Sequence, residues 1–107
     1  MPYNEELDSR IAKLVSKWYP ERKKMFGGTC YLLRGTLFCG VHRDRLILRL
    51  GVEAAAEALE KPFVSVFDIT GRVMKGWVMV EKGGFEGRRL AAWLDKAKAF
   101  AQTLPPK

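Results

Sequence analysis

Between residues 23 and 50 the sequence alternates apolar residues with others in a period of two, and this pattern constrains the fold more than any other feature of the chain. A period of two is typical of β-strands, because successive side chains point to opposite faces of a sheet. Gly27-Gly28 is expected to break or bulge the first strand. Arg34-Gly35 and Arg43-Asp44 fit two-residue hairpin turns. The segment therefore predicts three antiparallel strands joined by tight turns.

These two turns give an expected register, and the register sorts the side chains onto two faces. The expected cross-strand pairs are Cys30 with Cys39, Tyr31 with Phe38, Leu32 with Leu37, Val41 with Leu46, Cys39 with Leu48 and Phe38 with Arg49. One face is wholly apolar and is expected to lie against helices: Cys30, Leu32, Leu37, Cys39, Val41, Leu46, Leu48 and Leu50. The other face is mixed: Tyr31, Leu33, Thr36, Phe38, His42, Arg45, Ile47 and Arg49.

Helical periodicity flanks this strand region on both sides. Residues 4–18 predict an amphipathic helix, and residues 51–61 predict a short alanine-rich helix that Pro62 stops. Residues 63–67 and 77–81 predict two more strands, and a last helix carries an apolar stripe between residues 90 and 101. The order is helix, three strands, helix, two strands, helix. It predicts one α+β domain over residues 1–107, with two layers and the helices packed on one face of a mainly antiparallel sheet.

Composition limits the cellular setting and hints at partners. The 107 residues are 48% apolar and carry a formal charge of +7, as in an ordinary soluble domain. No apolar run is long enough to cross a membrane, and the acidic start at residues 1–6 lacks the pattern of a signal peptide. We therefore expect a cytoplasmic protein with no membrane contact. The positive charge favours encounter with nucleic acid or other anions, but the cations are scattered along the chain, and solubility alone favours such a charge.

Few residues offer chemistry. Cys30 and Cys39 have a spacing that matches no zinc pattern, and two interpretations remain, inert core thiols or a cross-strand redox pair. His42 is the only histidine, and no nucleophile or carboxylate is evidently paired with it. The glycine pairs lack the spacing of a phosphate-binding loop. The sequence thus predicts no enzyme, with no catalytic residue, no metal and no cofactor.

The mixed sheet face is the strongest candidate for a binding surface. Its candidate partner-binding residues are Tyr31, Phe38, His42, Arg45, Ile47 and Arg49. Aromatic rings with arginines are typical of protein-interaction hot spots, and this favours a protein partner or a second copy in a homodimer. The same residue types bind single-stranded nucleic acid, and an ordinary solvent face is the third interpretation. A weaker candidate is an anion site at Arg72, Lys75 and Gly76, where turn amides and basic side chains come together.

Two phrases and the last helix carry a family resemblance. They are Lys24-Met25-Phe26-Gly27-Gly28, the run from Asp68 to Val78, and a closing helix with Trp93 and Phe100. Together they resemble the N-terminal domain of the TfoX/Sxy family, bacterial regulators associated with competence, from about Tyr3 to Lys107. The resemblance implies the same order of helices and strands and a non-catalytic, transcription-linked regulatory role. Full-length members carry a second, C-terminal domain, and the likeness here is to the N-terminal domain alone.

Overall fold

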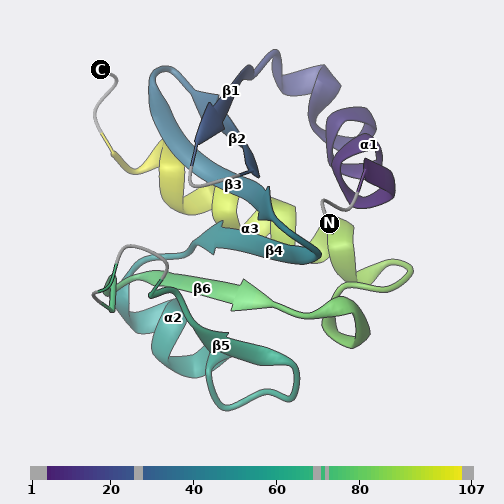
Figure 1. The fold of residues 1–107 in the computed structure, drawn as a ribbon. Coiled ribbons are helices and arrows are strands. Elements are labelled where there is room, and N and C mark those ends of the chain that lie inside the picture. Colours follow the sequence, from purple (N-terminus) through teal and green to yellow (C-terminus); the bar gives the residue numbers. More distant parts are fainter. Residues whose placement is uncertain (1–4, 26–27, 69–70, 72, 105–107) are drawn as a thin grey trace.

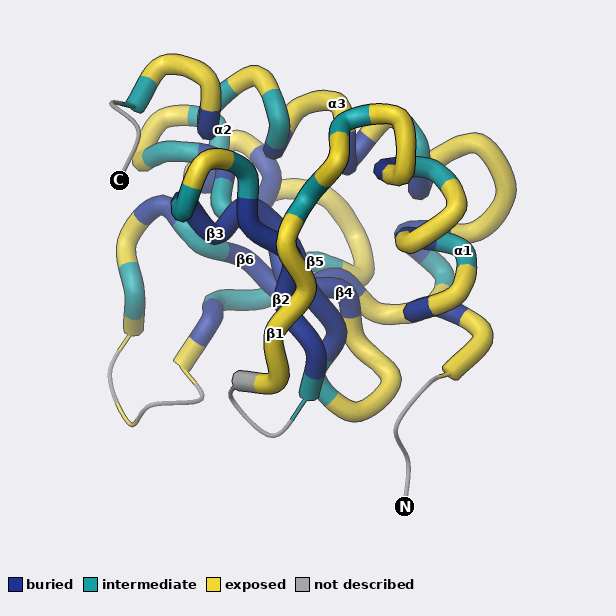
Figure 2. Tube along the Cα trace, turned by 90° about the horizontal axis from the view of Figure 1, so that it is seen from above, coloured by how far each residue is buried: buried dark blue, intermediate teal, exposed yellow. Residues whose placement is uncertain are grey.

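One antiparallel sheet runs through the protein, and the helices lie on one of its faces (Figures 1 and 2). The computed structural model describes residues 5–25, 28–68, 71 and 73–104. Within these residues the sheet has six strands in the order β1-β2-β3-β4-β6-β5. The strands are β1 (Glu21–Met25), β2 (Gly28–Leu33), β3 (Thr36–His42), β4 (Arg45–Arg49), β5 (Val64–Val66) and β6 (Trp77–Val80). The helices are α1 (Glu5–Val15), α2 (Val52–Ala58) and α3 (Arg89–Gln102), with short 3-10 turns η1 (Ser16–Trp18) and η2 (Lys82–Gly84). The predicted α+β class is confirmed.

The first group of strands has four members where the sequence predicted three. β1 pairs antiparallel with β2, and Met25 pairs with Gly28 at the end where the two strands meet. Gly27 lies outside the described residues. The expected break of the first strand is therefore confirmed, because β1 ends at Met25 and a separate antiparallel strand begins at Gly28, whereas the alternative of a bulge within one strand is wrong.

A β-bulge in the hairpin of β2 and β3 overturns the expected register. Leu32 pairs with Leu37, but Tyr31 pairs with Cys39, so that Phe38 is the extra residue on β3. Cys30 then faces Gly40 and not Cys39. A bulge sets two residues of one strand against one of its partner and changes which face the following side chains occupy. The second hairpin is as predicted, with Cys39 opposite Leu48 and Val41 opposite Leu46.

The main core lies between the sheet and the helices. Helix α3 covers the middle of the sheet and buries the predicted apolar stripe, Leu90, Trp93, Leu94, Ala97 and Ala101. Helix α1 adds Leu7, Ile11 and Val15 to the same cluster. Both spacings follow the 3.6-residue period of an amphipathic helix, as predicted. Among the described helices, none is long and apolar enough to cross a membrane.

A second, smaller core fills the face of the sheet that carries no helix. Ile47 and Met79 on this face are buried by Phe67, with Met74 and Trp77 packed against them. The rings of Phe67 and Trp77 stack with their centroids 5.4 Å apart. The amide of Met74 donates to the carbonyl of Phe67 at 2.9 Å, which folds the β5–β6 connection back over the strands. Apolar side chains therefore cover both faces of the middle of the sheet.

Candidate binding surfaces

The predicted aromatic and arginine face does not exist as one surface. Because the bulge reverses the facing of β2 relative to the prediction, Tyr31 and Phe38 enter the main core, where they are 2% and 0% exposed. Ile47 points to the opposite face as expected, but it is 0% exposed beneath Phe67. The expectation that these three side chains form an accessible face is therefore wrong. Tyr31 and Phe38 are therefore not exposed on one surface with His42, Arg45 and Arg49, as the hypothesis requires.

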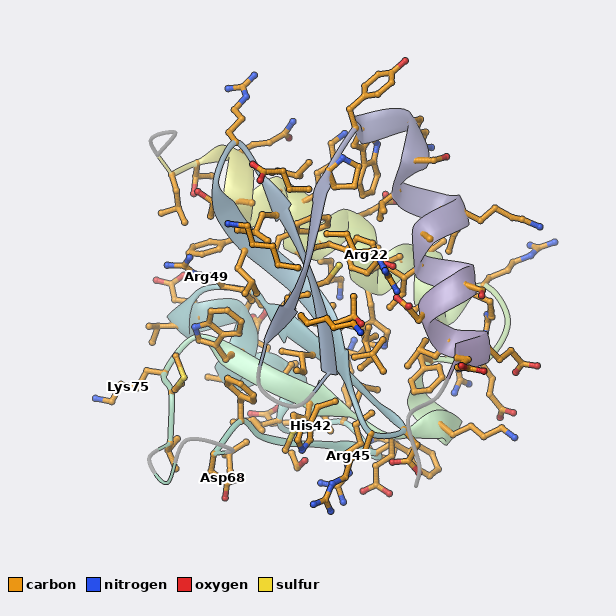
Figure 3. All side chains as sticks on the ribbon, turned by 45° about the horizontal axis from the view of Figure 1, so that its top comes forward. Arg22, His42, Arg45, Arg49, Asp68 and Lys75 are labelled. Carbon is orange, nitrogen blue, oxygen red and sulfur yellow. The ribbon has the colours of Figure 1, made fainter. Side chains whose placement is uncertain are left out.

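Of the remaining members of that set, His42 and Arg45 lie close together, and Arg49 lies apart from them (Figure 3). His42 and Arg45 pair at the end of the β3–β4 hairpin, where Arg45 is exposed and His42 half-buried. Arg49 lies at the other end of β4, with its guanidinium 5.5 Å from the ring centroid of Trp77 and 5.7 Å from that of Phe100. Two rings thus hold Arg49 in cation–π contacts, which is a structural use of this side chain.

The predicted anion segment is only partly described, since Arg72 lies outside the described residues. Lys75 is exposed and points away from the body of the protein (Figure 3). Gly76 is buried at φ 88°, and its carbonyl accepts from the amides of Leu50 and Gly51 at 2.8 and 3.1 Å. The backbone of Gly76 therefore ties the β5–β6 connection to the residues that precede α2, which is a structural role. The anion site stays a prediction.

The two cysteines occupy different cores. Cys39 belongs to the helix-side cluster, whereas Cys30 packs with Leu32 and Leu37 in a separate group. Both are free and fully buried thiols. Burial raises the pKa of the Cys30 thiol to about 11, and it raises that of Cys39 as well. The unreactive core interpretation thus has physical support, while the bulge removes the direct cross-strand pairing that the redox interpretation used.

A buried carboxylate network joins α1 to the first hairpin. The Tyr31 hydroxyl donates to Oδ1 of Asp8 at 2.5 Å, and Arg22 forms a salt bridge with Oδ2 of the same carboxylate. Burial raises the pKa of Tyr31, and the hydrogen bond to Asp8 raises it further. Arg22 reaches this carboxylate from strand β1, and in Figure 3 its side chain points toward α1. These contacts satisfy an otherwise costly buried charge and clamp the edge strand onto the helix.

Exposed large hydrophobic residues concentrate on one stretch of the chain. Five such side chains are exposed among the described residues, and four of them lie between residues 52 and 73: Val52 (63%), Leu59 (39%), Phe63 (49%) and Val73 (60%). Val52, Ala56 and Leu59 follow each other at helical spacing on and just after α2, all exposed, and we call them the α2 face. Glu53, Glu57 and Glu60 are exposed around it. The α2 face is thus an apolar stripe with an acidic rim.

A groove runs between α2 and α3. Two cavities of about 320 and 480 Å³ share Lys61, Trp93 and Lys96 in their walls. The larger continues along both helices past Ala58 and Phe100. The smaller opens toward the segment between α2 and β5, and we call it the Phe63 cavity.

Sequence reasoning missed both of these features. The stripe of the α2 face was available from the helical spacing of residues 52, 56 and 59, which lie about a quarter of a turn around the helix from the buried Ala55 and Ala58. The Phe63 cavity gave no such signal, because its walls come from three segments of the chain that only the tertiary fold brings together.

A six-stranded antiparallel sheet with helices on one face defines a small two-layer α+β protein. Among the described residues, no group of three His, Cys, Asp or Glu side chains could hold a metal ion. The family model of the TfoX N-terminal domain matches residues 20–101. The chain therefore belongs to the TfoX N-terminal domain family, as its sequence suggested. Comparison with curated proteins and with solved structures gives no significant match.

Proposed function

We propose that this protein is a non-catalytic regulatory module of the bacterial cytoplasm, and that it works by protein–protein contact through the α2 face. Family membership favours a regulatory, competence-linked role, since the TfoX N-terminal domain takes its name from such regulators. The observation that carries the contact surface is the exposed apolar stripe on α2. Contiguous exposed apolar residues with a polar rim are typical of interaction sites.

The arrangement of ionisable groups supports a non-catalytic role. A catalyst needs a nucleophile or an acid–base pair within reach of a substrate. Here Asp8 is engaged with Tyr31 and Arg22, and both thiols are buried.

Charge favours a second copy of this chain as the occupant of the α2 face. The three glutamates around the face stand in a chain of net charge +7, so that another copy offers a predominantly basic surface to meet them. Complementary charge of this kind steers association and sets partner choice. Burial of Val52 and Leu59 would supply the apolar contribution.

Sedimentation equilibrium at low salt tests this proposal over a wide range of protein concentration. We expect self-association that weakens as salt rises, because the acidic rim of the α2 face on one copy meets a basic surface of the next copy. Val52→Ser and Leu59→Ser should each weaken this association by about tenfold, because each removes part of a buried aliphatic side chain. Tyr19→Ser is the control, since Tyr19 is 89% exposed and lies outside the α2 face. A monomer at every concentration, or an equal effect of the Tyr19 variant, would overturn self-association through α2.

A further inference from the structure

The Phe63 cavity differs from the α2 face in its charge. It measures about 320 Å³ and is walled by eight residues, of which Lys61, Arg89 and Lys96 are basic and none is acidic. Phe63 and Trp93 supply aromatic surface in the same walls. Small-molecule sites of proteins begin at about this size, and they combine apolar walls with a few convergent polar groups.

The lysines at this cavity are held in place without being neutralised. The Nζ atoms of Lys61 and Lys96 lie 5.2 and 5.3 Å from the ring centroid of Trp93. That ring is itself fixed, because its Nε1–H donates to the carbonyl of Gly84 at 2.8 Å. Cation–π contact orients an ammonium group but leaves its charge available to an anion.

Arg89 adds a third positive charge. Its Nη1 donates to the carbonyl of Gly83 at 3.0 Å, which directs the guanidinium toward the cavity wall. Within the part of the chain that the structure describes, none of these three cations forms a salt bridge with a carboxylate. Three cations that form no salt bridge with a described carboxylate lie around one cavity, and Glu57 belongs to the wall of the adjoining larger cavity and not to this one. Together the three cations favour a multiply charged anion.

Phe63 is the second unusual feature. It is 49% exposed and has φ 69°, a left-handed conformation that is unfavourable for a residue with a side chain. Its carbonyl accepts from the amide of Glu81 at 2.8 Å, so the backbone is anchored in this strained state. A Cβ atom added at Gly83 would lie 2.7 Å from Cε1 and Cζ of Phe63, which shows that the outer end of the ring lies against the glycine. Strained residues of this kind concentrate at ligand sites.

We propose that the Phe63 cavity binds a nucleotide, with the base stacked on Phe63 and the phosphate between Lys61, Lys96 and Arg89. Multiply charged phosphate oxygens suit several separate donors, and every base offers a planar face for stacking. The cavity has room for about one nucleotide, supplied either as a free mononucleotide or as the end of a single strand. The site shares no residue with the α2 face, so it stands or falls separately from self-association.

The Trp93 indole provides a direct readout. In ¹H–¹⁵N correlation spectra of the whole chain, we would follow the three indole cross-peaks during titration with AMP, ATP, inorganic phosphate, a 5′-phosphorylated thymidine octanucleotide and an octaglutamate peptide. AMP and ATP should shift the Trp93 peak saturably, and Trp18 and Trp77 should move less. If the octanucleotide binds more than tenfold tighter than AMP, the natural ligand is the end of a single strand. If AMP binds more than tenfold tighter than the octanucleotide, the natural ligand is a free nucleotide. No shift of the Trp93 peak by any phosphate probe, or a shift by octaglutamate alone, would overturn the proposal.

Two variants separate stacking from charge. Phe63→Gly removes the ring and relieves the left-handed strain, so it should fold at least as well as the parent. Its affinity for AMP should fall about tenfold while its affinity for inorganic phosphate is unchanged. Lys61→Ala/Lys96→Ala should weaken both ligands, whereas Lys13→Ala/Lys23→Ala changes the net charge equally at exposed sites on α1 and β1. Equal weakening by the two double variants, or unchanged AMP affinity in Phe63→Gly, would refute the site.

Discussion

Gly51 should not tolerate alanine, for two reasons that can be measured separately. The residue precedes α2 with φ 90° and ψ 158°, a region of backbone space that essentially only glycine occupies. An alanine there would also place its Cβ 2.7 and 2.8 Å from two carbons of the Phe100 ring. The backbone is not free to move away, because the carbonyl of Gly76 accepts from Gly51 at 3.1 Å.

The expected loss follows from adding these effects. The unfavourable backbone conformation costs about 1–3 kcal/mol. Forcing an extra methyl group against a packed ring costs about 1–3 kcal/mol more. The stiffer unfolded chain of the alanine variant returns about 0.4–1 kcal/mol. Gly51→Ala should therefore lower the free energy of unfolding by about 3 kcal/mol at the centre of these ranges, and by about 1–6 kcal/mol at their extremes, which is a large part of the stability of a typical domain.

Gly71 supplies a matched control, since it has φ 88° and nothing within 4 Å of an added Cβ. Gly71→Ala should show the backbone cost alone. Urea unfolding followed by tryptophan fluorescence would compare both variants and the double-mutant cycle of Gly51→Ala with Phe100→Ala. We expect the cycle to recover about 1–3 kcal/mol of coupling, because removing the ring removes the clash. Equal losses for the two glycine variants, together with an additive cycle, would show that the contact with Phe100 imposes no constraint.

Two further predictions concern buried ionisable groups. Tyr31→Phe should lower the free energy of unfolding by about 1–3 kcal/mol in urea titrations, because the variant removes the hydroxyl that donates to the buried Asp8 carboxylate. Tyr19→Phe is the control and should leave the free energy of unfolding nearly unchanged, because Tyr19 is 89% exposed. Burial raises the pKa of Cys30 to about 11, so the unfolded chain loses this proton at lower pH than the folded protein. The free energy of unfolding should therefore fall between pH 8 and 10, and this thiol should account for about 1 kcal/mol of the fall. In Cys30→Ala the free energy of unfolding should fall by that much less over the same range. Parallel curves of unfolding free energy against pH for parent and variant would contradict the assignment.

Much of the fold follows from periodicity in the sequence. Helices α1 and α3 follow from apolar stripes at helical spacing, and the β3–β4 register follows from a two-residue turn. These are local patterns, and the burial of Leu90 or Val15 only confirms what the spacing requires. The family phrases between Asp68 and Val78 also have a structural reason, because Met74 and Trp77 cover the helix-free face of the sheet.

The predicted aromatic and arginine face was wrong because of one residue, Phe38, which is the extra residue of the bulge. An unbroken two-residue period assigns Phe38 and Tyr31 to the same face as Arg49, and the extra residue of the bulge moves both aromatic side chains into the core. Nothing in the local sequence indicates a bulge at Phe38, since its advantage is tertiary. At 0% exposure the ring fills space beneath α3 and lies 6.2 Å from the ring of Trp18. The stabilisation gained by burying an aromatic ring exceeds the cost of one disrupted ladder position.

This displacement has a consequence for where recognition can occur. With Phe38 in the helix-side core and Ile47 beneath Phe67, strands β3 and β4 carry no exposed aromatic side chain on either face among the described residues. The first edge strand, β1, carries four charged residues in succession, 21–24, which disfavours pairing with another chain. Recognition is then left to the helical layer and the connections beside it, where Val52 and Leu59 are exposed and Phe63 is held in a strained conformation. A sheet filled on both faces is a rigid scaffold, and such a scaffold lets loop and helix residues hold a binding geometry that a free hairpin face would lose.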